Sequence, residues 1–278
     1  MSDFLSSMLE DEGDESEHPS ALTIAGSDSG GGAGIQADLK TFAACGIHGT
    51  SVVTLVTAQN TQSVSGIEML PEPIIHQQFQ AVVEDIPPLA TKTGALGNER
   101  VIEVVADLLR ERPLDNLVVD PVMISKHGDP LLPEPAQRLF RDRMLEGVDL
   151  VTPNRHEAEA LSDQTVGNVD SMKEAAKCIF DFGPKNVVIK GSHFDEIVRD
   201  IFYDGTGFIE YGADRIRSNR VHGSGCVYSS AITARLALGD DLPEALGFAR
   251  EFINGAIEKA PLIGEGMPPV HPMFDHWT

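Results

Sequence analysis

Residues 21–39, ALTIAGSDSGGGAGIQADL, join a short apolar run to a helical pattern through a glycine-rich segment. The run at 21–25 is typical of a buried strand, and apolar Ile35, Leu39 and Phe42 recur at the spacing of one helix face. Loops at the carboxyl ends of strands are where open α/β sheets bind ligands. The stretch therefore predicts a strand, a ligand-binding loop and a helix, in that order.

Apolar runs alternate with amphipathic helical segments along most of the chain. We expect strands at residues 50–58, 89–96, 116–122, 149–153 and 186–191. We expect helices at residues 33–45, 74–86, 99–110, 134–145, 172–182, 225–238 and 243–259. Repeated β-α-β units indicate a mainly parallel sheet with helices on both faces. Residues 61–70 and 197–216 indicate small antiparallel strands at an edge or in a flap, with a turn at 204–207 in the second segment.

The length and the charge of the chain bound its organisation. A chain of 278 residues suits one domain, and the acidic, mostly polar composition of residues 1–19 predicts a disordered tail before a domain at 20–278. The net charge is -22, from 43 acidic and 21 basic residues, which argues against nucleic-acid and membrane partners. Such a carboxylate-rich surface would also suit a salt-rich cytoplasm.

The three cysteines, Cys45, Cys178 and Cys226, are too scattered for a disulfide framework or a zinc site. Together with the lack of a secretion signal or of ~20 consecutive apolar residues, they predict a cytoplasmic protein.

The segment VHGSGC at 221–226 opens a predicted helix. Backbone N–H groups at a helix start concentrate positive potential, so this turn suits a transferring phosphate. The same field would lower the pKa of Cys226 and favour its thiolate. The alternative is an ordinary helix start with a buried cysteine.

Three further positions suggest contacts with phosphates or a metal. Asn154 and Glu157 lie three residues apart at a predicted helix start, so they can offer oxygens to Mg²⁺ or its waters. The alternative is a capping box, and the motif alone favours it. Lys190 ends a predicted strand and could contact phosphates, and Asp120 is a comparable strand-end carboxylate.

In this order, the stretches resemble the hydroxymethylpyrimidine/phosphomethylpyrimidine kinases of thiamine biosynthesis, within the ribokinase-like class. The resemblance rests on AGSDSGGGAGIQADLKTF at 25–42, TAQNT at 57–61, DPVMISKHGDPLL at 120–132, TPNRHEAEAL at 152–161, IKGSH at 189–193 and HGSGC at 222–226. It implies a single three-layer α-β-α domain that uses ATP and Mg²⁺. The expected reactions phosphorylate 4-amino-5-hydroxymethyl-2-methylpyrimidine and then its monophosphate. A homodimer built through edge strands is also implied.

The resemblance also implies roles for single residues. The pyrimidine pocket would comprise Gly26, Asp28, Ala33, Asp38, Gln59 and Val122. The catalytic anion hole would comprise Gly223, Ser224, Gly225 and Cys226. The nucleotide would meet Lys190, Asn154 and Glu157, and Mg²⁺ would be organised by Asn154, by Glu157 through water, and by Asp120. Cys226 takes the position of the catalytic base, where it would accept the proton of the hydroxyl or chiefly orient that hydroxyl.

Two departures and two alternatives accompany this interpretation. Ala95 stands where the family often has methionine, and Ser224 stands where threonine is common. The nearest alternative is a pyridoxal kinase of the same fold, against which Gln59 favours the pyrimidine. The other is a binding or regulatory protein without catalysis, and the intact HGSGC segment argues against it.

Overall fold

The computed structural model describes residues 18–123, 132–193 and 196–276. Nearly all of the acidic tail predicted at 1–19 lies outside these residues, so its disorder stays a prediction. Most of the DPVMISKHGDPLL segment, residues 124–131, also lies outside them. The described domain begins with a strand at Ser20, where the sequence predicts the folded part to start.

Within the described residues, nine strands form one sheet in the order β3-β2-β1-β4-β5-β6-β7-β8-β9. The strands are β1 (Ser20–Asp28), β2 (His48–Gln59), β3 (Val64–Met69), β4 (Ala90–Thr93), β5 (Leu117–Val119), β6 (Leu150–Val151), β7 (Val187–His193), β8 (Ile197–Tyr203) and β9 (Phe208–Asp214). The pairs between β2 and β7 are all parallel, whereas β3, β8 and β9 are antiparallel additions. This arrangement confirms the predicted mainly parallel sheet and both antiparallel segments.

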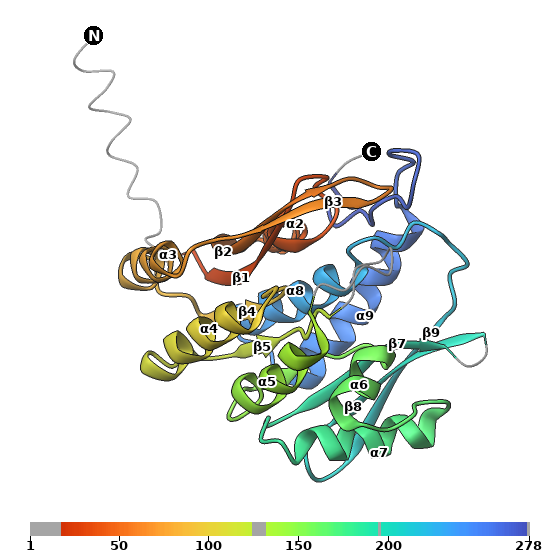
Figure 1. The fold of residues 1–278 in the computed structure, drawn as a ribbon. Helices are drawn as coiled ribbons and strands as arrows, with labels where there is room; N and C mark the ends of the chain where they lie inside the picture. The colour runs from red at the N-terminus through yellow and green to blue at the C-terminus, as the bar shows by residue number, and fades with distance from the viewer. Residues whose placement is uncertain (1–17, 124–131, 194–195, 277–278) are drawn as a thin grey trace, which may run out of the picture.

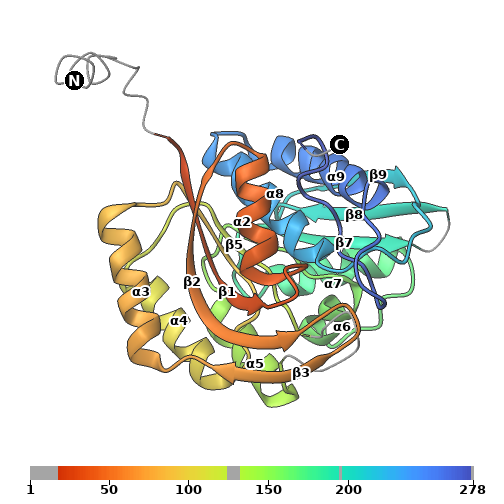
Figure 2. The same cartoon turned by 90° about the horizontal axis from the view of Figure 1, so that it is seen from above.

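Helices cover both faces of the sheet, so the domain has three layers (Figures 1 and 2). One face carries α2 (Gly34–Ala44), α8 (Ser224–Ala237) and α9 (Leu242–Glu258). The other carries α3 (Glu72–Asp85), α4 (Glu99–Glu111), α5 (Glu134–Met144), α6 (Arg155–Ser162) and α7 (Val169–Phe180). The predicted three-layer α/β architecture is confirmed. Among the helices that the structure describes, none combines the length and apolar character needed to cross a bilayer.

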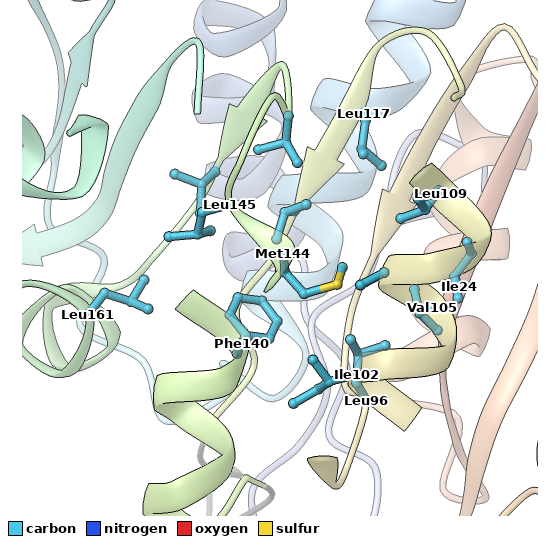
Figure 3. Close-up of a cluster of buried hydrophobic side chains, with 14 of the residues drawn as sticks. Ile24, Leu96, Ile102, Val105, Leu109, Leu117, Phe140, Met144, Leu145 and Leu161 are labelled. Atoms are coloured by element: carbon cyan, nitrogen blue, oxygen red, sulfur yellow. The ribbon is translucent and has the colours of Figure 1, made fainter. Parts of the chain in front are cut away.

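Alternation along the strands supplies a separate apolar core to each layer of helices. In β1, Leu22 and Ile24 face the core under α3 to α7, whereas Ala21 faces the core under α2, α8 and α9. Figure 3 shows side chains from α4 and α5, among them Phe140, meeting strand side chains such as Leu117. Burial on both faces explains why the central strands read as continuous apolar runs.

The strand order places a crevice at the carboxyl edge of the sheet. After β1 the chain crosses to β2 on one side, and the later strand β4 pairs with β1 on the other side. The loops that follow β1 and β4 therefore lead in opposite directions and leave a crevice between them. Open α/β sheets bind ligands at such a point.

The core of α5 provides a test of this packing. Phe140 is 1% exposed and belongs to the core under α3 to α7. Replacing it by Ala should lower the free energy of unfolding by about 3–5 kcal/mol, because the change leaves a cavity. Leu262, which is 79% exposed, is the control, and Leu262→Ala should change stability by no more than about 0.5 kcal/mol. Urea unfolding measures both, and equal small effects would contradict the assigned packing.

Candidate active site

A cavity of about 420 Å³ opens at the carboxyl ends of the parallel strands. It is lined by every residue that the sequence predicts for the site: Gly26, Asp28, Ala33, Asp38, Gln59, Asp120, Val122, Asn154, Glu157, Lys190, Gly223, Ser224, Gly225 and Cys226. Segments far apart in the chain thus converge on one space. Their individual roles stay predictions, and the contacts below give each side chain its surroundings.

The loop after β1 is organised by the carboxylate of Asp28. Its Oδ1 accepts a hydrogen bond from Gly30 N at 2.8 Å, and its Oδ2 accepts bonds from Gly32 N at 3.0 Å and Ala33 N at 2.8 Å. Burial raises the pKa of Asp28, but hydrogen bonds from His222 and the loop N–H groups outweigh burial and lower it. Asp28 therefore shapes the loop as an ionised carboxylate, and its contact with a substrate stays a prediction.

The glycine loop packs directly against the turn that opens α8. Gly223 has φ +75°, and a Cβ there would lie 1.8 Å from Gly32 O. A Cβ on Gly32 would in turn lie 2.4 Å from His222 Cδ2. Nε2 of His222 lies 3.0 Å from Asp28 Oδ2, which adds a side-chain contact between the turn and the glycine loop. Glycine is favoured at Gly223 because a Cβ would strike the loop backbone, and at Gly32 because a Cβ would strike the ring of His222.

Helix α8 begins inside the cavity with its first turn open to a ligand. Its N-cap is Gly223, which provides no side-chain cap, and Ser224, Gly225 and Cys226 all line the cavity. A helix start without a side-chain cap leaves backbone N–H groups available, and they favour an anion. The geometry agrees with the predicted anion hole.

The predicted effect of the helix field on Cys226 is wrong in the structure. Burial raises the pKa of the thiol to about 11, and the carboxylates of Asp38 and Asp120 add to the rise. The ammonium of Lys92 and the N–H of Gly34 oppose it without reversing it. Loss of hydration outweighs both of these influences, so Cys226 carries its proton at neutral pH.

Two buried aspartate–lysine pairs lie on either side of the first turns of α8. Lys190 forms an ion pair with Asp120, and Ser229 Oγ donates to the same carboxylate at 3.1 Å. Lys92 Nζ donates to Asp38 Oδ1 at 2.8 Å, and Ser230 Oγ donates to that oxygen at 2.7 Å. Consecutive serines of α8 therefore hold one pair each.

The pair of Lys92 and Asp38 went unrecognised from the sequence. The available signal was a lysine inside the apolar run LATKTGAL, because a charge within a buried strand needs a partner.

A second buried network also went unrecognised. Asp200 in β8 accepts hydrogen bonds from Arg250 Nε and Tyr228 Oη, each at 2.8 Å. Its Oδ1 also accepts from Gly191 N at 2.6 Å. Because Gly191 follows Lys190, the network fixes the end of β7 against α8 and α9, and so fixes the backbone that carries the predicted phosphate lysine.

Asn154 and Glu157 form the capping box that the motif favours. Asn154 Oδ1 accepts from Glu157 N at 3.1 Å, and Glu157 Oε2 accepts from Asn154 N at 2.8 Å. Burial raises the pKa of Glu157 to about 7, the ammonium of Lys190 opposes the rise, and the nearby carboxylate of Asp120 adds to it. The carboxyl group thus ionises near neutral pH.

The oxygen donors in this corner fit a hydrated magnesium ion. Glu157 and Asp120 repel one another as carboxylates, and a divalent cation would relieve that repulsion. Within the described residues, no group of three or more His, Cys, Asp and Glu side chains is placed to hold a metal. Mg²⁺ keeps several of its waters in sites with one or two carboxylates, so a site that acts through water suits this donor set.

Gln59 stands at the other end of the cavity, where β2 ends. Its Oε1 lies 3.2 Å from Thr57 Oγ1, and its Nε2 lies 3.3 Å from His222 Nε2. The turn that follows is held by the C-terminal segment, because Met267 N donates to Thr61 O at 2.7 Å. The amide is thus positioned on the cavity wall beside the glycine loop.

Comparison with known proteins agrees with this geometry. Residues 28–271 match the family model described as phosphomethylpyrimidine kinase. The chain belongs to this family. Its relatives include the hydroxymethylpyrimidine/phosphomethylpyrimidine kinase of Haemophilus influenzae, which is 44% identical over 263 residues, or 92% of this chain and 96% of that protein. The names of these relatives describe kinases of hydroxymethylpyrimidine and its phosphate.

Solved structures extend the family likeness to the fold. The phosphomethylpyrimidine kinase from Clostridium difficile is 43% identical, with a TM-score of 0.77 over 87% of this chain and 100% of that one. An ADP complex of Bacillus subtilis pyridoxal kinase is 34% identical, with a TM-score of 0.88 over 94% of this chain and 100% of that one. These neighbours confirm the ribokinase-like fold.

The chain spans about half the length of two further curated relatives. These are the probable bifunctional enzyme of thiamine biosynthesis from Oryza sativa, matched over 47% of its length, and the bifunctional protein from Geobacter sulfurreducens, matched over 52%. The kinase family therefore corresponds to one part of those longer proteins.

The raised pKa of Glu157 predicts a dependence of stability on pH. Its folded pKa of about 7 exceeds the ordinary 4.5, so its protonated form stabilises the fold below pH 4.5 and this contribution is lost as the pH rises through about 7. The loss amounts to about 3 kcal/mol. Glu157→Gln keeps an acceptor for the cap but does not ionise.

Urea unfolding in metal-free buffer at pH 5 and pH 8 measures the effect. The free energy of unfolding should fall more steeply for the wild type than for the Gln variant. A parallel fall in both proteins would contradict the burial of an ionising Glu157, and added Mg²⁺ should reduce the difference.

Proposed function

We propose that this kinase transfers the γ-phosphoryl group of ATP to the hydroxymethyl group of 4-amino-5-hydroxymethyl-2-methylpyrimidine, and then phosphorylates the monophosphate. The observation that carries the proposal is the convergence of the glycine loop, Gln59 and the open start of α8 on one cavity. The names of the curated relatives supply the substrate class. The ADP complex of the Bacillus relative supports a nucleotide on the same fold.

The cavity divides into an acceptor side and a nucleotide side. The pyrimidine would lie among Gly26, Ala33, Gln59 and Val122, where the amide of Gln59 offers both a donor and an acceptor to the ring edge. The phosphates of ATP would extend towards Lys190. The first turn of α8 lies between these two sides, so its N–H groups are placed to stabilise charge on the transferring group.

Mg²⁺ would be held by Asp120 and Asn154 and, through water, by Glu157. When bound, the ion would neutralise charge on the phosphate oxygens. The capping box holds Asn154 and Glu157 in place at the cavity wall before any ligand arrives. Lys190, paired with Asp120, keeps a positive charge in the same corner.

Cys226 acts on the acceptor hydroxyl as an orienting group. Because its thiol is protonated at neutral pH, it cannot remove the hydroxyl proton in the ground state. Phosphoryl transfer proceeds through a loose transition state, in which the hydroxyl keeps its proton until late. A thiol at this position can hold the oxygen in line, and the hydroxyl proton passes to an oxygen of the transferred phosphoryl group as the new bond forms.

The oligomeric state and the location belong to the same proposal. A homodimer is supported by the position of β3 at the sheet edge and by exposed Val56 and Ile67 on β2 and β3, which are 42% and 40% accessible. A cytoplasmic location is supported by the three free cysteines. The excess of acidic residues supports small-molecule substrates and argues against nucleic acid as a partner.

Pyridoxal phosphorylation is the second candidate function. The specific observation in its favour is the fold likeness to a pyridoxal kinase, at a TM-score of 0.88. Both acceptors are flat heteroaromatic rings with a hydroxymethyl group, and a pocket with few polar contacts discriminates weakly between such shapes. The sequence identity to the phosphomethylpyrimidine kinase is higher, which favours the pyrimidine.

Release of ADP from Mg·ATP tests the function directly. The acceptors are 4-amino-5-hydroxymethyl-2-methylpyrimidine, its monophosphate and pyridoxal, each assayed in low and in molar KCl. We expect turnover of both pyrimidines. Turnover of pyridoxal alone would assign the second function, and silence with all three acceptors at both salt concentrations would favour a non-catalytic binding protein.

Replacement of Cys226 by Ala should lower kcat by about tenfold or more, because the group that orients the hydroxyl is lost. Cys45 provides a matched control, since it is a half-buried cysteine that does not line the cavity. Cys45→Ala should keep kcat within about twofold of the wild type. Near-normal turnover of the Cys226 variant would remove Cys226 from the mechanism.

A further inference from the structure

The ion pair of Lys92 and Asp38 lies in the wall of the cavity, and the roles described above do not use Lys92. Both side chains are fully buried, with 0% exposure. Lys92 comes from β4, Asp38 comes from α2, and both contribute to the cavity wall. A buried ion pair is weak evidence for stability, because the cost of removing two charges from water offsets their attraction. The pair therefore calls for a functional account.

Asp38 is held from three directions. Its Oδ1 accepts from Lys92 Nζ at 2.8 Å and from Ser230 Oγ at 2.7 Å, and its Oδ2 accepts from Thr23 Oγ1 at 2.7 Å. These donors belong to β4, α8 and β1. The carboxylate is thereby fixed, and it fixes the ammonium in turn.

The link to the reacting end of the cavity runs through α8. Ser230 follows Cys226 by four residues, which is one helical turn, so both side chains lie on the same face of the helix. The bond from Ser230 to Asp38 therefore sets the position of Cys226 over the ion pair.

Three titratable groups face Lys92. They are Asp38 of α2, Cys226 of α8 and Asp120 after β5. Burial lowers the pKa of Lys92, but these groups outweigh burial and raise it, so the ammonium keeps its proton. Lys92 is also the strongest of the influences that lower the pKa of Cys226. A charge sealed from water acts over a longer range than an exposed one.

We propose that Lys92, fixed by Asp38, is a positioning residue that stabilises negative charge on the sulfur of Cys226 and on the acceptor oxygen held beside it. The part that concerns the acceptor oxygen rests on the proposed kinase function. Lys190 serves the phosphate side of the first turn of α8, and Lys92 serves the acceptor side. The two cations thus bracket the path of the transferred group.

The experiment compares Lys92→Met with the double variant Asp38→Asn/Lys92→Met. The double variant leaves no unpaired charge, so it separates the electrostatic role from a folding defect. The first readout is the rate at which iodoacetamide alkylates Cys226 at pH 8, followed by mass spectrometry of its peptide. Below the thiol pKa this rate follows the thiolate fraction, and one pKa unit is about tenfold.

We expect alkylation of Cys226 to slow by about tenfold in Lys92→Met and by about threefold in the double variant, which also loses the opposing carboxylate. We also expect kcat to fall by about tenfold or more in both variants. The matched control is Asp149→Asn/Lys185→Met, the same changes at an ion pair outside the cavity, and it should change neither readout.

An alkylation rate equal to the wild type in the double variant would overturn the proposal, whatever the value of kcat. Recovery of kcat in that variant would show that the pair is structural and would overturn it as well. The alkylation readout needs no substrate. If the wild type fails to phosphorylate either pyrimidine, the proposed function fails, and alkylation still decides whether Lys92 acts on Cys226.

Discussion

The start of helix α8 must lie at the carboxyl edge of the sheet, and two buried carboxylates hold it there. Ser229 donates to Asp120 and Ser230 donates to Asp38, so consecutive residues of one helix are tied to carboxylates from two different segments. A helix bound at only one of these points could rotate about its axis and turn its first N–H groups away from the cavity. The pairing with Lys190 and Lys92 supplies the charge balance that lets both aspartates stay buried.

The second constraint is the contact between two backbones that carry no side chains at the point of contact. Gly32 and Gly223 let the glycine loop and the α8 turn approach to a distance that any Cβ would prevent. Asp28 then joins the two segments, because its carboxylate accepts hydrogen bonds from N–H groups of the loop and also contacts the ring of His222. The acceptor pocket and the anion-binding turn are therefore one rigid unit, which favours a fixed distance between the acceptor and the transferred group.

The layout of the fold was predictable because burial of one face leaves a local trace in the sequence. The spacing of Ile35 and Phe42 places α2 within one residue of its observed ends, and the turn at 204–207 joins two antiparallel strands as expected. The pocket residues, such as Gln59 and Val122, came from the resemblance to the kinase family. They line one cavity because the strand ends of a parallel sheet meet at one edge, and their roles stay predictions.

What the sequence did not predict depends on contacts between distant segments. Lys92 meets Asp38 across 54 residues, and Asp200 meets Arg250 across 50. To predict such pairs one must know the order of the strands in the sheet, and the spacing of apolar residues does not give that order. The error over Cys226 has the same origin, since the field of the helix start is a local property, whereas the burial that outweighs it comes from packing around the cavity.

The net charge of -22 makes the local field of the cavity more important than it would be in a neutral protein. ATP and a phosphorylated pyrimidine are anions, so the surface as a whole repels them. That repulsion is screened beyond about 8 Å at physiological salt, whereas Lys92, Lys190 and the α8 N–H groups act within a few ångströms and away from water. On the proposed function, the acidic surface would affect the approach of the anions, and the buried cations would act on binding and transfer. This division would explain how a strongly acidic chain handles phosphate, because the cations of the cavity are buried where salt screens them least.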